Sequence, residues 1–107
     1  MSETLIAVRA LVNTGDFLVS AHADEELRKD EISLRDLIAG VQSSVVVEDY
    51  PNFGKGPCVL VLQRDAAGAP IHVLWGLRKS TTRPIVMITA YRPDPPRWSA
   101  DFLRRQQ

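Results

Sequence analysis

The chain has 107 residues, of which 45% are hydrophobic and 24% charged, and its formal net charge is zero. These values are typical of one globular domain, residues 1–107, that can bury a single core without disulfides or a structural metal. No run of 18 apolar residues predicts a transmembrane helix, and no basic stretch followed by an apolar one predicts a signal peptide. With one cysteine, Cys58, in an apolar stretch, we expect a buried thiol, no internal disulfide and a cytoplasmic protein without a membrane partner.

Charge is divided unevenly along the chain. Residues 1–50 hold four Lys and Arg against ten Asp and Glu, a net charge of −6, whereas residues 51–107 hold nine against three, a net charge of +6. A basic half can attract a polyanion such as RNA. Alternatively, the two halves of one small domain complement each other, and the sequence leaves both interpretations open.

The first 43 residues predict three helices. Ser2, Ser20 and Ser33 are typical N-cap residues, and each precedes a first turn with acidic side chains or apolar residues at helical spacing. Gly15 is a natural stop for the first helix. Residues 17–19 are too few to classify by periodicity, and we expect an extended connector there.

Four strands are predicted in the rest of the chain, over residues 44–50, 58–64, 71–77 and 85–92. Only short, turn-rich segments separate them, so none of these gaps has room for the crossover of a parallel pair. Trp98 and Phe102, four residues apart, indicate a short C-terminal helix. The predicted fold is therefore α+β, with N-terminal helices followed by a four-stranded antiparallel meander.

Five groups of residues carry a family resemblance. They are Ser20-x-His22-Ala23, Ile32-Ser33, Val47-Glu48-Asp49-Tyr50-Pro51, Gly68-x-Pro70-x-His72-Val73 and Ile88-Thr89-x-Tyr91-x-Pro93-Asp94-Pro95-x-x-Trp98. In this ordered set, from Ser20 to Arg105, the chain resembles the bacterial family called domain of unknown function 4258. That family looks like part of the barnase–EndoU–colicin–RelE group of small ribonucleases.

The resemblance implies the same helices-then-sheet plan, a toxin that acts on RNA, and a cognate antitoxin, often of the zinc-finger type, as partner. One departure stands out, because many relatives carry arginines in the second helix where this chain has Glu26 and Asp30. Our leading hypothesis is a small metal-independent endoribonuclease of the toxin–antitoxin class that cleaves RNA by acid/base catalysis. The alternative is a non-catalytic binding module with the same fold.

His22 falls in the first turn of the predicted second helix. The positive end of the helix dipole lowers a histidine pKa and favours the neutral imidazole of a general base, whereas the neighbouring Asp24, Glu25 and Glu26 act in the opposite direction. A histidine packed between helix and sheet, bonded to a backbone group, explains the same position equally well.

His72 lies in the middle of a predicted strand, on the face that holds Leu74 and Gly76, and the glycine leaves room there for a ligand or another backbone. Two histidines can supply the acid and the base of RNA cleavage. The alternative for His72 is a structural histidine with its hydrogen bonds satisfied.

Tyr91 and Arg92 end the last strand and point to opposite faces. Alternation places Tyr91 with Ile85, Met87 and Thr89. Its phenol can orient a phosphate or transfer a proton, or it can pack as a core ring with a wet hydroxyl. The guanidinium of Arg92 can bind phosphate through two hydrogen bonds and stabilise the transition state, or it can be a solvated charge.

Five further basic residues are candidates for RNA binding: Arg28, Lys55, Arg78, Lys79 and Arg97. No metal site is predicted, because the two histidines and the cysteine are widely separated and no paired ligand spacing occurs. Gly54-Lys55-Gly56 lacks the pattern of a phosphate-binding loop. We therefore expect no cofactor.

Overall fold

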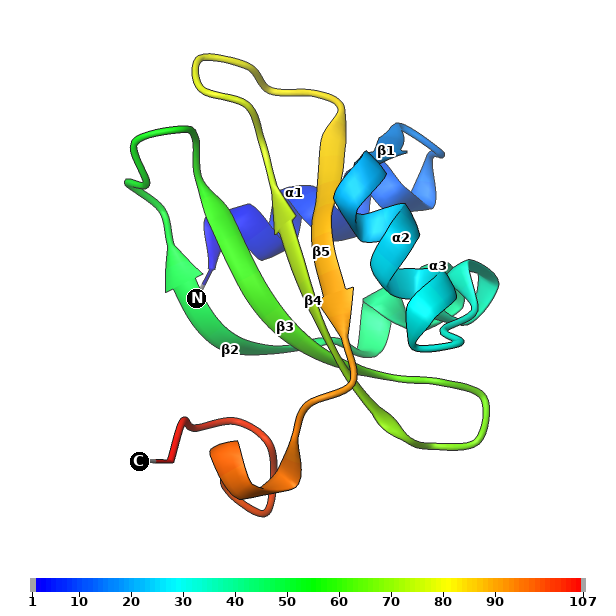
Figure 1. Cartoon of the computed structure of the whole chain (residues 1–107). Helices are drawn as coiled ribbons and strands as arrows, with labels where there is room; N and C mark the ends of the chain where they lie inside the picture. The colour runs from blue at the N-terminus through cyan, green and yellow to red at the C-terminus, as the bar shows by residue number, and fades with distance from the viewer. Residues whose placement is uncertain (1, 107) are drawn as a thin grey trace.

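The computed structural model describes residues 2–106. Its elements are α1 (Glu3–Asn13), β1 (Phe17–Val19), α2 (Ala21–Lys29), α3 (Leu34–Gly40), the 3₁₀ turn η1 (Val41–Ser43), β2 (Val45–Tyr50), β3 (Cys58–Arg64), β4 (Pro70–Gly76), β5 (Ile85–Tyr91) and the 3₁₀ turn η2 (Pro95–Arg97). The helices lie on one side of a twisted sheet, and the C-terminal residues lie below its other side (Figure 1). No helix within residues 2–106 is long and apolar enough to cross a bilayer.

The three predicted helix starts are confirmed. Ser2 Oγ accepts the Leu5 amide (3.1 Å) and Ser20 Oγ accepts the Ala23 amide (3.0 Å). Ser33 Oγ accepts the amide of Asp36 (3.3 Å). Each cap satisfies one of the amides that a helix leaves without an internal partner, which is why serine is favoured there.

The predicted four-stranded antiparallel meander is wrong, because the sheet has five strands in the order β1-β5-β4-β3-β2. Strands β2 to β5 are antiparallel neighbours, but β1 pairs in parallel with β5. The segment expected to be a connector is therefore a strand, in which Phe17 lies opposite Ile85 and Val19 opposite Met87. The connection from β1 to β5 contains α2, α3 and the other three strands. It is therefore long enough for the crossover of a parallel pair, although no gap between adjacent strands is.

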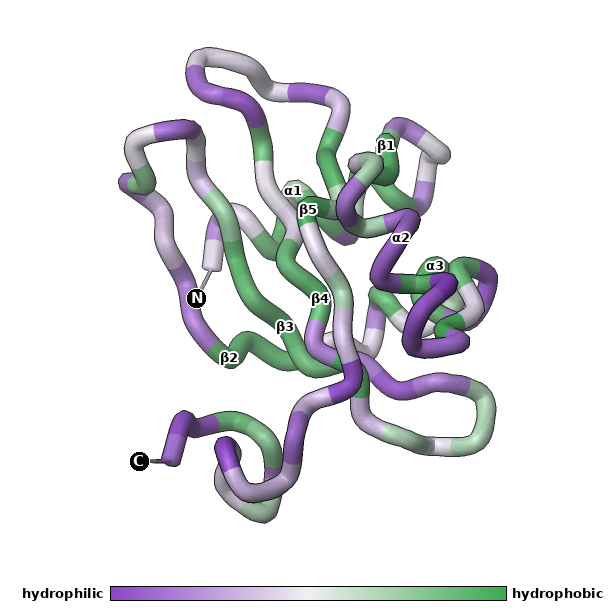
Figure 2. The backbone as a smooth tube through the Cα atoms, in the orientation of Figure 1, coloured by the Kyte–Doolittle hydropathy of each residue, from purple (hydrophilic) through white to green (hydrophobic). Residues whose placement is uncertain are grey.

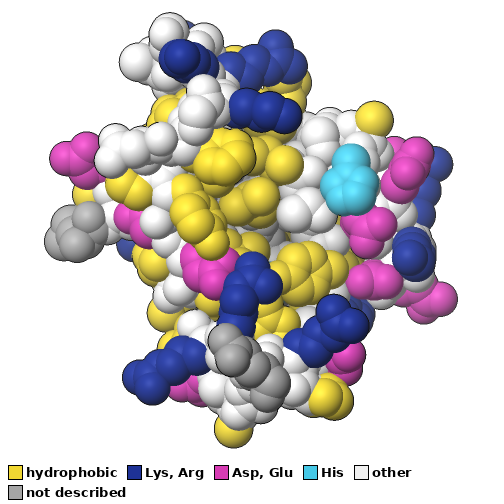
Figure 3. Space-filling model, turned by 60° about the vertical axis from the view of Figure 1, so that its left-hand side comes forward, with side chains coloured by type: hydrophobic (Ala, Val, Ile, Leu, Met, Phe, Trp, Pro, Cys, Tyr) yellow, Lys and Arg dark blue, Asp and Glu magenta, His cyan; other side chains and the backbone are white. Residues whose placement is uncertain are grey.

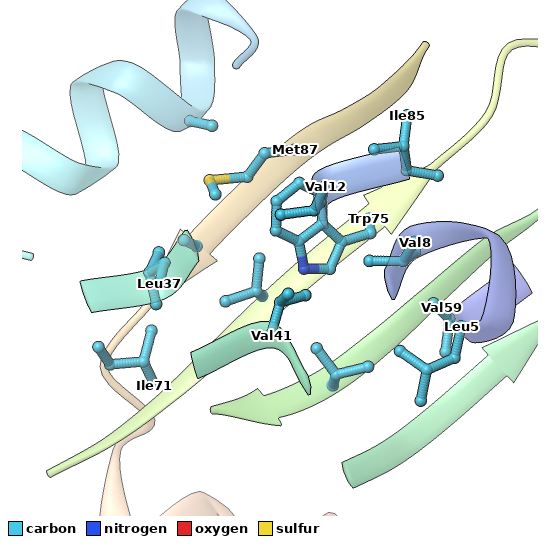
Figure 4. Packing of buried hydrophobic residues seen from close by; sticks show 14 of the residues in the cluster. Leu5, Val8, Val12, Leu37, Val41, Val59, Ile71, Trp75, Ile85 and Met87 are labelled. Carbon is cyan, nitrogen blue, oxygen red and sulfur yellow. The ribbon is translucent and has the colours of Figure 1, made fainter. Parts of the chain in front are cut away.

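The helices cover one face of the sheet and enclose the core with it. Ile71, Val73, Trp75, Ile85 and Met87 are fully buried there, together with side chains from α1 and α3 (Figure 4). Each such side chain contributes roughly 1.5–3 kcal/mol when it is buried. The tube coloured by hydropathy shows β3 and the core parts of β4 and β5 as hydrophobic and most of α2 as hydrophilic (Figure 2).

An irregularity in β5 changes the face on which its last residues lie. Leu74 of β4 pairs with Thr89, but the next residue, Trp75, pairs with Met87, so Ile88 has no opposite partner. Such a bulge shifts the alternation of side chains by one position. Tyr91 therefore lies with Thr89 on the helix-free face, and the predicted common face with Ile85 and Met87 is wrong.

The predicted C-terminal helix is also wrong. The chain makes the short turn η2, and then residues 98 and 105 pair as an isolated β-bridge around a tight turn. Phe102 has a positive φ of 62°, and Asp101 Oδ1 accepts the amide of Leu103 (3.1 Å), which closes the turn. The side chain of Ser99 likewise accepts the amide of Arg104 (3.1 Å), and these local bonds stabilise the turn in place of a helix. We call residues 93–106 the C-terminal strap.

Candidate functional site

Side chains of the helix-free face come from alternate positions of four strands. They include Glu48 and Tyr50 of β2, Cys58, Leu60 and Leu62 of β3, His72, Leu74 and Gly76 of β4, and Val86, Ile88, Thr89 and Tyr91 of β5. The C-terminal strap covers one end of this face. Figure 3 shows hydrophobic side chains gathered in a hollow, with Lys and Arg side chains above and below it.

One cavity lies beside the C-terminal strap, and a second lies farther from it on the same face. The polar cavity, of about 680 Å³, is lined by Tyr91, Arg92, Asp94, Arg97, Trp98, Arg105 and Gln106. The apolar groove, of about 520 Å³, is lined mainly by hydrophobic side chains at the other end of the face. Tyr50 lines the groove and is also hydrogen-bonded to Glu48, so it lies between the two.

His72 is fully buried beneath the C-terminal strap. Its Nε2 lies 2.8 Å from the carbonyl oxygen of Phe102, and its Nδ1 lies 3.1 Å from the hydroxyl oxygen of Tyr91. A carbonyl only accepts, so Nε2 donates, and the neutral ring then accepts the Tyr91 hydroxyl proton at Nδ1. Burial lowers the pKa of His72, in part opposed by the Phe102 carbonyl, so the ring is neutral at pH 7.

Tyr91 connects this histidine to the polar cavity. Its ring packs edge-on against that of His72, with the centroids 5.3 Å apart, and its exposed part lines the cavity wall. Burial raises the pKa of the Tyr91 hydroxyl, so it is protonated at neutral pH. A phenol that is hydrogen-bonded to a neutral imidazole can transfer its proton to the imidazole while it accepts a proton from another group.

Glu48 and Arg105 form an ion pair that fastens the C-terminal strap to β2. Arg105 Nε donates to Glu48 Oε2 (2.6 Å) and its Nη2 donates to Oε1 (2.9 Å). These bonds lower the pKa of the Glu48 carboxyl, and the Tyr50 hydroxyl, which donates to the same carboxylate (2.7 Å), has its pKa raised by that bond. The guanidinium also lies 4.9 Å from the centre of the Trp98 ring, a cation–π distance.

Arg92 lines the polar cavity, but its donors hold other parts of the chain together. Its Nε donates to the backbone oxygen of Asp30 (3.1 Å) and its Nη2 to that of Glu31 (3.3 Å). Its Nη1 donates to Asp65 Oδ2 (3.0 Å), an ion pair to the turn between β3 and β4. Arg92 thus joins the end of β5 to the end of α2 and to this turn.

His22 lies apart from His72. It is exposed in the first turn of α2 and lines neither cavity. The N-cap residue Ser20 ties that helix start to β5, because its Oγ donates to the Ile88 carbonyl (2.9 Å). Of the predicted catalytic residues, the structure therefore brings together His72, Tyr91 and Arg92.

Comparison with known families adds one result to this geometry. The sequence model of a family described as a domain of unknown function (DUF4258) matches residues 19–92. The chain belongs to this family. The match ends at Arg92, so α1 and the C-terminal strap lie outside it. No curated protein and no solved structure matches the chain.

The basic residues predicted to bind RNA are scattered in this DUF4258 protein. Lys55 and Arg78 line the apolar groove, and the Lys79 amide donates to the Lys55 carbonyl (3.0 Å) in the adjoining loop. Arg97 lines the polar cavity, whereas Arg28 lies on α2, paired with Asp24 (3.0 Å). Among residues 2–106, no group of three or more His, Cys, Asp and Glu side chains could hold a metal ion.

Two residues at the centre of this site were missed from the sequence. Glu48 is a charged residue in a strand otherwise rich in valine, which is a weak signal for a special role. Arg105 gives no such signal, because it follows the strands and is separated from Glu48 by 57 positions. Only the path of the C-terminal strap brings the two together.

Proposed function

We propose that the protein is a small metal-independent endoribonuclease of the toxin class, controlled by an antitoxin, and that it cleaves RNA in the polar cavity. The observation that carries this proposal is the hydrogen bond between the Tyr91 hydroxyl and a buried, neutral His72 at a cavity lined by Arg92, Arg97 and Arg105. Guanidinium groups suit phosphate oxygens, and a phenol–imidazole pair can move a proton.

The reaction would follow the chemistry of the RNA backbone. The 2′-oxygen of a ribose forms a bond to the neighbouring phosphorus, and the bond from phosphorus to the 5′-oxygen breaks. Tyr91 takes the proton of the 2′-hydroxyl while its own proton passes to Nδ1 of His72, and water protonates the departing 5′-oxygen. Arg97 and Arg105, which are more exposed than Arg92, supply positive charge to the phosphorane-like transition state.

The test compares two tyrosines of the same face that differ in their hydrogen-bond partners. Tyr91→Phe removes the hydroxyl bonded to His72 and should lower the cleavage rate by about 10²–10⁴-fold. Tyr50→Phe removes the hydroxyl bonded to Glu48, outside the lining of the polar cavity, and should change the rate little. The measurement is single-turnover cleavage of a labelled RNA, with circular dichroism to verify that each variant folds.

His22 provides an independent check on the same assay. Because it lies outside the polar cavity, His22→Ala should cleave at nearly the wild-type rate. A loss as large as that of Tyr91→Phe would replace the Tyr91–His72 pair with a two-histidine mechanism. A folded Tyr91→Phe variant with the wild-type rate would contradict catalysis by the pair.

A second candidate function is a non-catalytic binding module. It is favoured by the complete burial of His72, whose two ring nitrogens are both engaged in hydrogen bonds, and by the use of Arg92 as a connector. This candidate expects RNA binding that weakens with added salt, since phosphate contacts release counterions, but no cleavage by wild-type protein. Induced expression in bacteria, scored for growth arrest and RNA cleavage together, distinguishes the two.

A further inference from the structure

The apolar groove is a second cavity that the proposed ribonuclease reaction does not use. Its floor consists of side chains from the helix-free face, including Leu74, Val86 and Ile88, and its walls are the loops after β2 and β4. The volume of about 520 Å³ falls in the range of small-molecule sites, which are mostly apolar with a few polar groups that orient the ligand.

Two glycines occupy positions at the groove where there is no room for a larger residue. A Cβ atom on Gly76 would lie 2.8 Å from Cδ1 of Ile88 and 3.0 Å from Cβ of Cys58, so a larger residue would disturb the floor. A Cβ atom on Gly56 would lie 2.0 Å from the Leu77 carbonyl, so only glycine lets the two loops meet. Glycine at these two positions therefore allows the close packing that shapes the groove.

Aromatic side chains stand exposed at the groove. Phe53 is 54% exposed and Tyr50 is 41% exposed, although both line the groove. Large exposed apolar groups gathered around a hollow mark a binding surface more often than scattered ones do. Covering them with an apolar ligand would remove this surface from water.

The charged side chains that line the groove are both basic. Lys55 and Arg78 line it, and the loops over residues 51–57 and 77–84 contain four basic residues and no acidic one. Within residues 2–106, Lys55, Arg78 and Lys79 form no ion pair, whereas Arg83 is paired with Asp16 (2.6 Å). The groove thus offers free positive charge at its rim and an apolar floor.

We propose that the apolar groove binds a small amphipathic organic anion, with its flat or aliphatic body over Leu74, Val86 and Ile88. Its anionic group lies at the rim, between Lys55 and Arg78. The occupant is a free small molecule, because the hollow has the volume of a ligand site and the two charged side chains that line it are both basic. This site is separate from the polar cavity, so it does not depend on the ribonuclease proposal.

Two fluorescent probes with the same ring system test the charge and the apolar parts separately. 8-Anilino-1-naphthalenesulfonate carries one anionic group, and N-phenyl-1-naphthylamine is its uncharged counterpart. We expect one sulfonate probe to bind per chain, about tenfold more tightly than the neutral probe at low salt, and this preference should shrink as salt is added. Equal affinity of the two probes at low salt would overturn the proposal.

Variants assign the binding to the groove. Lys55→Gln with Arg78→Gln should weaken the sulfonate probe to the affinity of the neutral one and leave the neutral probe unchanged, whereas Phe53→Ala should weaken both. Lys29→Gln, an exposed charge on α2, is the matched control and should alter neither. Amide and methyl NMR shifts on titration should be confined to the groove; binding that maps elsewhere, or that the double variant leaves intact, would overturn the assignment.

Discussion

The two faces of the sheet are built from alternate residues of the same strands, yet they differ in what they hold. The covered face is mostly apolar, and its buried polar side chain Gln63 has both ends satisfied, by the Trp75 indole (3.1 Å) and the Leu37 carbonyl (2.7 Å). The helix-free face carries a buried histidine, a carboxylate–guanidinium pair and an open groove. The difference indicates that one face supplies the stability that allows the other to keep polar groups and a cavity.

The strongest test of this comparison uses two neighbouring residues of β5 that face opposite ways. Met87 is fully buried on the covered face, whereas Ile88 is 37% exposed at the groove. Met87→Ala should lower the free energy of unfolding by about 2–5 kcal/mol, since it leaves a cavity in the core. Ile88→Ala should cost about 1 kcal/mol or less, and urea unfolding followed by circular dichroism measures both. Equal costs would remove the distinction between the faces.

A smaller effect concerns the buried histidine of the helix-free face. The pKa of His72 is lowered in the folded protein, so the unfolded chain binds the proton more readily. Stability from His72 is therefore fully present above pH 6.5, the ordinary histidine value, and is lost as the pH falls through the folded pKa. The slope can reach about 1.4 kcal/mol per pH unit.

The measurement is the free energy of unfolding between pH 7.5 and 5.0, a range above the carboxylate titrations. His72→Gln, which has hydrogen-bonding groups but no titration there, should lose the slope. A His72→Gln variant with the wild-type slope would assign the pH dependence to another group.

The smallest effect is expected from the ion pair that holds the C-terminal strap. Arg105 and Glu48 are partly exposed, and such pairs contribute about 0.2–1 kcal/mol. Arg105→Gln should therefore lower the global stability only slightly, yet it should increase hydrogen exchange of strap amides such as that of Ser99, which is bonded to the Arg104 carbonyl (2.8 Å). Unchanged exchange in the strap would show that Trp98 and the Phe102 carbonyl hold it without the ion pair.

The parts of the fold that could be predicted from sequence are those with local causes. Serine caps, helical periodicity and β-branched runs act within a few residues, so the helices and β2 to β5 were expected close to where they lie. Strand β1 could not be recognised, because three residues carry no period and their partner lies far along the chain. The bulge at Ile88 was equally hidden, since it depends on how β5 fits β4.

The candidate site shows the same limit. His72 and Tyr91 were identified as candidates, and they lie in one cluster because they are opposite each other in the β4–β5 register. Their environment could not be predicted, because burial of His72 depends on the C-terminal strap, which was expected to be a helix. Arg92 was expected to bind phosphate. In the structure it is hydrogen-bonded to Asp30 and Asp65, which belong to two turns far away in the sequence, so these partners could not be predicted.

The parallel pair of β1 and β5 has a consequence for synthesis of the chain on the ribosome. Val19 is made first, and its partner Met87 follows only after the whole crossover has been translated. At typical rates of translation, roughly 3–14 s separate the two strands. During that time β2, β3 and β4 can form their local hairpins, but the first strand has no place to dock. The nascent protein must therefore keep the apolar side chains of Phe17 and Val19 from other partners until the last strand arrives.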